Sequence, residues 1–333
     1  MKLSVVIPAY NAAAFIEKSY QQLQAQELQE VEFLYVNNNS TDDTVAQIEK
    51  LQQTDTRVQL LQQPKQGAAA ARNRGIQAAK GAYVYVFDVD DEIYPGALKE
   101  MMAVLDAHPG VEAVFGKMVK SYKGIAETKK PKAESGKVVV KEKPYWGLKW
   151  FSSLKDVVGP PAFLYRKKVF ENIGYYNESI RNNEDTAFDI KLGMLCTVAF
   201  LDRYVYLYFK HASSTIQTSK RQMPRAFMVW PRLVKEHLPF YLSHEVPKRF
   251  ETLLFSQLFQ AMGRQLVYTR GYVKRRQLKK ELLDELKAVK IPRVISRYLT
   301  ILALCPWGGI HKVYRYVVVR YAVKHLPRQK PDS

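Results

Sequence analysis

The chain has 333 residues, of which 47% are hydrophobic and 25% are charged. These proportions are typical of a folded globular protein and exclude an intrinsically disordered one. The two cysteines, Cys196 and Cys305, lie far apart without metal-ligand spacing, which excludes a disulfide scaffold and fits a reducing cytosol. The apolar run at the start is too short for a signal peptide, and we identify no segment that approaches the roughly 20 apolar residues of a membrane span.

The net charge of +19 is unevenly distributed. From Arg221 onward there are 23 Lys and Arg against 7 Asp and Glu, a surplus of 16, so the first 220 residues carry only +3. A basic region attached to a nearly neutral body predicts a polyanionic partner. That partner is an anionic membrane surface, an anionic polymer or a nucleic acid.

The first 110 residues alternate between strand-like and helix-like segments. The expected strands are 3–7, 31–36, 58–61 and 83–87. The expected helices are 13–26, one that follows the 37–44 segment and runs through Gln53, 68–79 and 95–107. Ser40 or Thr41 is the expected N-cap of the second helix. Repeated strand–helix units predict a parallel sheet with right-handed crossovers.

The pattern changes after Gly110. We expect strands at 111–120, 138–140, 162–165 and 198–209, a lysine-rich exposed loop at 123–137 and a helix at 184–196. From Pro224 we expect helices broken at each proline, namely Pro231, Pro239, Pro247, Pro292 and Pro306. The predicted domains are therefore 1–220 and a helical, basic region at 221–333.

A buried-type strand, Tyr83–Phe87, runs directly into three aspartates, Asp88, Asp90 and Asp91. Ligands of open α/β sheets bind at the carboxyl ends of the strands. If the strand continued, Asp88 and Asp90 would share a face. Such a pair suits Mg²⁺ or Mn²⁺ held jointly with substrate phosphates. The alternative is a polar turn after an edge strand.

Four further motifs accompany the aspartates. They are Val5–Asn11, Asn37–Thr44, Lys65–Gly67 with Ala71–Gly75, and Asn183–Asp185. In this order and spacing they resemble family 2 glycosyltransferases with the GT-A fold, over roughly residues 1–215. The resemblance implies an α/β fold: a Rossmann-like, mostly parallel central sheet flanked by helices, followed here by the helical basic region.

The resemblance implies a nucleotide-binding role for several positions. Pro8, Ala9 and Tyr10 match the loop that packs against the base. Asn38 matches a position that is usually an aspartate contacting the base, and the chain has Asn37–Asn39 where the family commonly has Asp-Asp-Gly. An asparagine carbonyl can still accept a hydrogen bond from a uracil N–H. The alternative is a turn that tolerates left-handed backbone.

The same resemblance assigns the diphosphate and metal groups. Arg72 matches an arginine near the base and diphosphate, and Gly67 allows close backbone approach. Asp88 matches the aspartate that contacts the ribose. Asp90 matches the metal ligand, and Asp91 is a supporting acid in the same cluster. These matches imply a nucleotide-sugar donor, a UDP-sugar, with Mn²⁺ or Mg²⁺ to screen its diphosphate.

Glu184 and Asp185 stand at the start of the expected helix. In the resembled family one acid of this pair is the general base that takes the proton of the acceptor hydroxyl, and we assign Asp185, with Glu184 in reserve. A single displacement of this kind inverts the anomeric configuration without a protein nucleophile. The alternative is that both acids only stabilise a helix N-terminus.

His211, with Ser214, resembles a His-x-x-Ser segment that closes over the diphosphate or metal, so His211 is a candidate metal ligand or, equally, a structural histidine. Trp146, Trp150 and 159–161 lie where the family builds its acceptor site. Tryptophans at these positions could stack on sugar rings, although tryptophans are more often packed in the hydrophobic core.

The last hundred residues interleave cations with aromatic side chains. This composition suits an interfacial helix on anionic lipid. Val317–Val319 and the nearby tyrosines leave its amphipathic face poorly defined, so burial against the body or a homo-oligomer contact is the alternative.

The sequence thus predicts a metal-dependent inverting glycosyltransferase of a bacterial surface-polysaccharide, cell-wall or glycoprotein pathway. We expect it in the cytoplasm, peripheral at the inner face of the cell membrane. The acceptor would be a hydroxyl of a glycan, lipid-linked or protein-linked molecule. Two alternatives are a nucleotide-sugar-binding protein without turnover, motivated by Asn37–Asn39, and a nucleic-acid-binding protein, motivated by the charge. The nucleic-acid alternative leaves the carboxylates unexplained, and we expect no nucleic acid.

Overall fold

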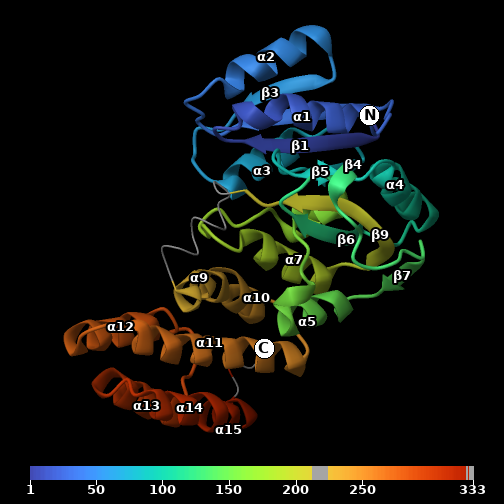
Figure 1. The fold of residues 1–333 in the computed structure, drawn as a ribbon. Helices are drawn as coiled ribbons and strands as arrows, with labels where there is room; N and C mark the ends of the chain where they lie inside the picture. The colour runs from blue at the N-terminus through green and yellow to red at the C-terminus, as the bar shows by residue number, and fades with distance from the viewer. Residues whose placement is uncertain (212–223, 328, 330–333) are drawn as a thin grey trace. The chain divides into compact units, whose positions relative to one another are not determined.

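The computed structural model describes residues 1–211, 224–327 and 329. The chain divides into two compact units, Met1–Ser214 and Thr215–Ser333. In Figure 1 the first unit is a sheet with helices on its faces, and the described part of the second unit is helical.

The first half of the sheet is built from parallel strands in the order β3-β2-β1-β4. Their bounds are β1 Leu3–Ala9, β2 Val31–Asn37, β3 Val58–Gln62 and β4 Tyr83–Val86. The connecting helices are α1 Ala13–Gln24, α2 Thr44–Thr54 and α3 Ala68–Ala78. The predicted strand–helix repeat is confirmed, and the carboxyl ends of β1, β2 and β4 meet at one edge of the sheet.

The second half of the sheet mixes directions. It contains β5 Glu92–Ile93, β6 Ala113–Ser121, β7 Val138–Lys141, β8 Phe163–Arg166 and β9 Val198–Phe209. β8 lies between β4 and β6 and is antiparallel to both, whereas β6 and β9 form a long parallel ladder. β5 and β7 both pair with β9 in antiparallel fashion. The sheet is mostly parallel because its longest ladders, β1–β2 and β6–β9, are parallel.

The remaining helices of this unit are α4 Ala97–Ala107, α5 Tyr145–Ser152, α6 Lys168–Ile173 and α7 Glu184–Leu195, with short turns η1 Ile125–Glu127, η2 Leu154–Asp156 and η3 Pro160–Ala162. α5 was not predicted from the sequence. Trp146 and Trp150 on α5 are buried and stacked with ring centres 5.6 Å apart, and the Trp146 indole donates to the Val198 carbonyl. They therefore belong to the core, as the packing alternative predicted.

The N-cap prediction for α2 is wrong. The helix begins at Thr44 after Asp43, and no cap side chain bonds to it. The Ser40 hydroxyl instead accepts the backbone N–H of Asn11 at 3.0 Å, and Asp42 accepts the N–H of Thr44 at 3.1 Å. The hydroxyl that was expected to cap α2 thus ties the loop after β2 to the loop after β1.

The second unit begins, in its described part, with one continuous helical run. It comprises α9 Arg225–Arg232, a π-helical segment η4 Leu233–His237 and α10 Leu238–Ser243. Pro231 lies inside α9 and Pro239 within the first turn of α10. Neither proline breaks the helical run, so the predicted breaks at these two positions are wrong. The residue four positions before Pro239 is Lys235, which lies in the π-helical segment, where a wider turn leaves room for the proline ring and needs no N–H from it.

The other helices of the second unit are α11 Lys248–Tyr268, α12 Tyr272–Asp284, α13 Arg293–Leu304, α14 Gly308–Val313, the π-helical segment η5 Tyr314–Val318 and α15 Val319–Lys324. Pro247, Pro292 and Pro306 do lie at helix boundaries. Tyr314 is fully buried against α11, and its hydroxyl donates to the Phe259 carbonyl at 2.8 Å. In the described residues, every helix is too short or too polar to cross a membrane.

Candidate active site

The three aspartates form a turn rather than a strand extension. β4 ends at Val86, and the backbone N–H of Asp91 donates to the Asp88 carbonyl at 3.0 Å. The prediction that Asp88 and Asp90 share a strand face is therefore wrong, because the turn sends each side chain to a different partner. Asp88 bonds to Arg72, Asp90 to His211, and Asp91 to the backbone N–H of Phe209.

Arg72 connects this turn to the start of α7. One terminal nitrogen of its guanidinium lies 3.0 Å from Asp88 Oδ1, and the other lies 2.8 Å from Glu184 Oε1. The guanidinium also lies over the ring of Tyr176, 5.6 Å from its centre. Arg72 is buried, and the charges of Asp88 and Glu184 outweigh burial and raise its pKa well above the ordinary value. A planar guanidinium can hold two carboxylates in this way.

The acid pair at the start of α7 is asymmetric. Glu184 is buried and bonded to Arg72, whereas Asp185 is half-buried and accepts the N–H of Thr186 at 2.6 Å. Burial, followed by the charge of Asp185, raises the pKa of Glu184, and Arg72 opposes this rise. Asn183, which precedes the pair, is in the left-handed conformation with φ 65°. Of the two carboxylates, Asp185 is the more accessible to a second substrate.

Asp90 and His211 form the second contact of the turn. Their side chains lie 2.6 Å apart, and the imidazole packs against Phe15 and Phe209. Burial, with the nearby charge of Asp88, raises the pKa of Asp90, while His211 lowers it. Ser214, the second residue of the His-x-x-Ser match, lies outside the described residues.

Asp91 is the most deeply placed of the three acids. Its Oδ1 accepts the backbone N–H of Phe209 at 2.9 Å, and its Oδ2 is buried without a hydrogen-bond partner in the described structure. Burial, followed by the charges of Asp88 and Asp90, raises its pKa well above the ordinary value. Three carboxyl groups crowded in this way carry negative charge that a divalent cation would relieve.

The residues around the turn fit such a cation only if substrate supplies ligands. Among the described residues, no three His, Cys, Asp or Glu side chains are grouped so that they could hold a metal ion by themselves. Asp90 and His211 offer one oxygen and one nitrogen donor. Mn²⁺ and Mg²⁺ commonly complete such a partial protein set with waters and phosphate oxygens.

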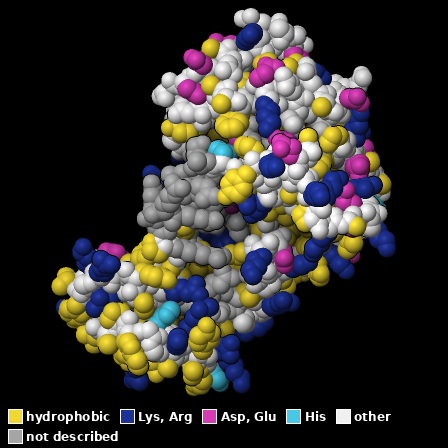
Figure 2. All heavy atoms as spheres, in the orientation of Figure 1, with side chains coloured by type: hydrophobic (Ala, Val, Ile, Leu, Met, Phe, Trp, Pro, Cys, Tyr) yellow, Lys and Arg dark blue, Asp and Glu magenta, His cyan; other side chains and the backbone are white. Residues whose placement is uncertain are grey.

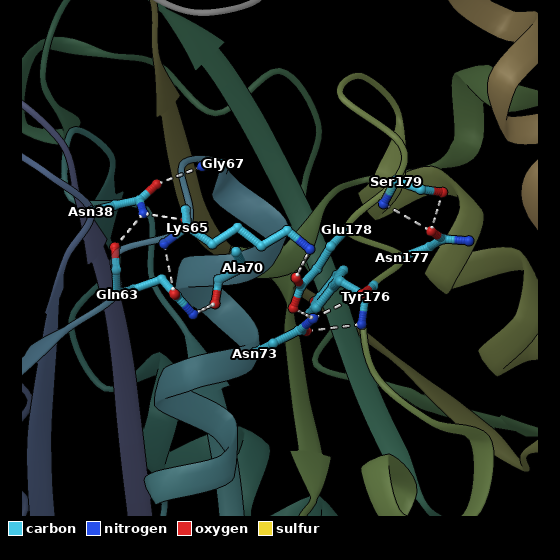
Figure 3. A network of polar contacts seen from close by, with 10 residues as sticks. All are labelled: Asn38, Gln63, Lys65, Gly67, Ala70, Asn73, Tyr176, Asn177, Glu178 and Ser179. Carbon is cyan, nitrogen blue, oxygen red and sulfur yellow. Dashed lines mark hydrogen bonds and ion pairs between the residues drawn. The ribbon is translucent and has the colours of Figure 1, made fainter.

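Asn38 holds the loop before α3 in place (Figure 3). Its amide nitrogen donates to the carbonyls of Gln63 and Lys65, at 2.9 and 2.7 Å, and its carbonyl accepts the N–H of Gly67 at 2.7 Å. Gly67 has φ +138°, which disfavours any larger residue there. The left-handed turn that was the alternative reading is also present, since Asn39 has φ 63°. The Asn38 amide is thus bonded to this loop on both its nitrogen and its oxygen.

A second set of contacts ties α3 to the segment before α7, and its residues were assigned no role from the sequence. Asn73 donates to the carbonyl of Tyr176 and to Glu178, and accepts the N–H of Tyr176 at 3.0 Å. Lys65 forms an ion pair with Glu178, with Nζ 2.6 Å from Oε2. Figure 3 shows this pair. Asn73 and Lys65 both occur in the motifs described above, but their partners lie more than a hundred residues further along the chain. Only the fold could identify them.

The loop after β1 adjoins the same region. The backbone N–H of Asn38 donates to the Ala9 carbonyl at 2.9 Å, so the Pro8–Tyr10 segment and the loop after β2 are side by side. Ala9 is buried, whereas the Tyr10 side chain is 55% exposed. The fold therefore brings together, at the carboxyl edge of β1, β2 and β4, the residues that the motifs single out.

Comparison with known proteins identifies this arrangement. The family model described as Glycosyl transferase family 2 matches residues 4–174, which is just over half of the chain. The chain belongs to glycosyl transferase family 2. It is a glycosyltransferase, as the motifs predicted.

A curated relative and two solved structures place the chain among other glycosyltransferases. The relative is the GalNAc(5)-diNAcBac-PP-undecaprenol beta-1,3-glucosyltransferase of Campylobacter jejuni, 32% identical over 56% of this chain and 58% of that protein. The chain therefore matches little more than half the length of this relative. Staphylococcus aureus TarS 1-349 in complex with UDP-GlcNAc has a TM-score of 0.67 at 20% identity, covering 98% of this chain and 92% of TarS 1-349.

The second solved structure is more distant. The mannosyltransferase PcManGT from Pyrobaculum calidifontis, in complex with GDP-Man and Mn²⁺, has a TM-score of 0.52 at 14% identity, covering 97% of this chain and 86% of that one. At these identities both structures support the fold alone. They agree with the predicted α/β architecture.

Proposed function

We propose that the protein transfers a sugar from a UDP-sugar to a hydroxyl of a glycan, lipid-linked or protein-linked acceptor, with inversion at the anomeric carbon. The observation that carries the proposal is the bridge from Asp88 through Arg72 to Glu184. It joins the turn assigned to the donor with the helix start assigned to the general base. The TarS complex with UDP-GlcNAc supports the choice of donor nucleotide.

The donor site uses three loops. Pro8, Ala9 and Tyr10 pack against the base, and exposed Tyr10 offers a ring for stacking. Asn38 and Gly67 act together, since Asn38 holds the loop in which Gly67 lies. Asp88 contacts the ribose, and Arg72 orients Asp88 by holding one of its carboxylate oxygens. Asn38 therefore shapes the base pocket indirectly, by holding the loop that contains Gly67.

Asp90 and His211 would hold a Mn²⁺ or Mg²⁺, with Asp91 as the supporting acid behind them. Such an ion would stabilise the negative charge that builds up on the diphosphate as its bond to the sugar breaks. The Mn²⁺ in the PcManGT complex supports a divalent cation in this fold. Asp91 fixes the end of β9 through the Phe209 N–H and thereby positions the segment that carries His211.

Asp185 acts as the general base. Its carboxylate takes the proton of the acceptor hydroxyl while that oxygen bonds to the anomeric carbon. The bond from this carbon to the diphosphate oxygen breaks, and the nucleoside diphosphate leaves. Glu184 is less suited to this role, because it is buried and paired with Arg72. We assign Glu184 to positioning the arginine.

We further propose that the enzyme works in the cytoplasm as a peripheral protein at the inner face of the cell membrane, in bacterial surface-glycan synthesis. The support is the surplus of 16 positive charges after Arg221 and the Campylobacter relative, whose name specifies GalNAc(5)-diNAcBac-PP-undecaprenol. A lipid-carried acceptor places such an enzyme at a bilayer.

The experiment that tests the transfer chemistry is a thermal-shift screen of nucleotide-sugars with and without Mn²⁺, followed by measurement of nucleotide release. We expect one UDP-sugar to raise the melting temperature, more strongly with Mn²⁺, because ligand binding stabilises the folded state. The same donor should be hydrolysed slowly without acceptor. Binding without any hydrolysis would favour the non-catalytic alternative, and no response to any donor would contradict the proposal.

A further inference from the structure

One stretch of the second unit contains cations but no acids. Between Ile291 and Pro327 the sequence has no Asp or Glu, and the structure places this stretch in α13, α14, η5 and α15. Its Lys and Arg residues are Arg293, Arg297, Lys312, Arg315, Arg320 and Lys324. None of these cations pairs with a carboxylate among the described residues, and Arg315 lies over the ring of Tyr316 at 5.0 Å. The positive charge of this stretch is therefore not neutralised within the described fold.

The same stretch exposes large apolar side chains. Trp307 is 68% exposed, Val317 60%, and Leu304 and Tyr321 58% each. Along the run from α14 to α15 the exposed positions recur every three or four residues and include Val313, Tyr316, Val317, Arg320, Tyr321 and Lys324. The opposite face, with Tyr314, Val318, Val319, Ala322 and Val323, is buried. The exposed apolar residues therefore lie on one face, which the sequence alone left undefined.

The start of α12 lies beside the end of α13 and is also apolar and exposed. The Arg275 side chain donates to the carbonyl of Ala303 at 2.7 Å, which fixes the first turns of α12 beside the end of α13. Tyr272 and Val273, at the start of α12, are exposed, and Val273 is 76% accessible. In Figure 2, hydrophobic and Lys or Arg side chains adjoin each other over α12–α15, with very little Asp or Glu.

We propose that this surface, the exposed faces of α13 and the α14–α15 run with Trp307 between them, docks on an anionic lipid bilayer. Trp307, Leu304 and Val317 would enter the boundary between headgroups and acyl chains, while the cations extend to lipid phosphates. The inference deepens the proposed location of the enzyme and is independent of the transfer chemistry. A second copy fits the surface less well, because a two-fold contact would bring unpaired cations of both chains together.

Trp307 provides a direct probe. The chain has 4 tryptophans, and the other three, Trp146, Trp150 and Trp230, are at most 6% exposed. Full-length protein is mixed with vesicles of equal parts phosphatidylglycerol and phosphatidylethanolamine, or of phosphatidylcholine alone. We expect the emission to shift to shorter wavelength with the anionic vesicles only, and brominated acyl chains to quench it. The Trp307→Phe variant should bind but lose the shift.

Two triple variants with the same change in net charge test whether vesicle binding depends on this surface or only on the total charge. Arg297→Gln, Arg320→Gln and Lys324→Gln together should lower the partition coefficient onto anionic vesicles on the order of 100-fold, since each such cation contributes about a factor of five. The matched control removes three exposed cations from the first unit, Lys129→Gln, Lys132→Gln and Lys137→Gln. The control should bind almost normally.

Three results would overturn the inference. One is an equal loss of vesicle binding in both triple variants, which would show that binding depends on the net charge of the protein and not on this surface. Another is vesicle binding without any change or quenching of Trp307 emission, which would place another surface on the lipid. The third is a concentration-dependent shift of Trp307 emission without lipid, which would show that a second copy covers the face. Donor binding and turnover in solution should be unchanged in every variant, so failure here is distinguishable from failure of the proposed activity.

Discussion

In the Met1–Ser214 unit the central cation, Arg72, is buried between two carboxylates, whereas between residues 291 and 327 six cations stand without acidic partners among the described residues. Buried charges of the first kind fix the relative positions of loops, because an unpaired charge there would be costly. Exposed charges of the second kind contribute little to the free energy of folding, and their electrostatic potential remains available to attract an anionic partner. The comparison predicts that similar substitutions will have very different effects in the two units.

The largest effect is expected from Arg72→Ala. Removing this guanidinium leaves Asp88 and Glu184 without their shared partner, and breaking a buried pair in this way costs about 3–5 kcal/mol of unfolding free energy. Urea denaturation followed by circular dichroism measures this loss. Arg72→Lys should recover only part of it, because an ammonium cannot bridge both carboxylates in fork geometry.

Arg74 is the matched control for that variant, since it lies on the same helix and is exposed. Arg74→Ala should change the unfolding free energy by less than about 0.5 kcal/mol. If both alanine variants were equally stable, Arg72 would not organise the site, and the comparison between the units would lose its basis.

The next effect concerns the metal. Asp90→Asn keeps the shape of the side chain but removes the charge proposed to hold Mn²⁺ with His211. We expect the factor by which Mn²⁺ increases the affinity for UDP to fall by about 10-fold or more. Calorimetric titration of UDP with Mn²⁺ and with chelator measures this factor. Undiminished strengthening by Mn²⁺ in this variant would remove Asp90 from the metal site.

A smaller effect is expected from Asn38→Asp, although the family usually has aspartate there. The Asn38 amide donates to the carbonyls of Gln63 and Lys65, and a carboxylate would face both carbonyls without a proton to share. The variant should lose about 1–2 kcal/mol of unfolding free energy and show faster hydrogen exchange at 63–67.

Asn11→Asp is the control for that substitution. The Asn11 side-chain carbonyl accepts the backbone N–H of Thr41 at 2.8 Å, and a carboxylate preserves this bond. Its stability should change less. An Asn38→Asp variant that is fully stable and binds UDP more tightly would show that Asn38 acts on the base directly.

The smallest effect on stability is expected in the second unit. Arg297→Gln removes an exposed cation, so the unfolding free energy should change by less than about 0.5 kcal/mol. A loss comparable with that of Arg72→Ala would mean that these cations support the fold, and the proposed membrane surface would have to be reconsidered.

Much of the fold follows from local sequence. The strand predicted at 198–209 is β9 within the same bounds, and the βα repeats appear where their periodicity indicates. The insertion of β8 between β4 and β6 was not predictable, because a short strand carries no signal for its non-local partners. Pro231 and Pro239 do not end a helix, contrary to the prediction, and only Pro239 has a π-helical segment in the turn before it.

The candidate site was predictable in its residues but not in their contacts. The motifs select Arg72, Asp88 and Glu184, yet only the folded chain shows that one arginine holds both acids. Asn38 was assigned to the base from its position in the motif. Its bonds to a loop some 25 residues further on could not be read from the sequence, because they depend on how β2 and β3 pair.

In the proposed mechanism the two acids at the start of α7 have different tasks, Asp185 as the general base and Glu184 as the partner of Arg72. The most direct test measures kcat and donor affinity for Asp185→Asn and Glu184→Gln side by side. We predict that Asp185→Asn lowers kcat roughly 10²–10⁴-fold with donor affinity nearly unchanged, whereas Glu184→Gln weakens donor binding by releasing Arg72. Normal turnover in Asp185→Asn, or a loss confined to its donor affinity, would show that Asp185 is not the general base.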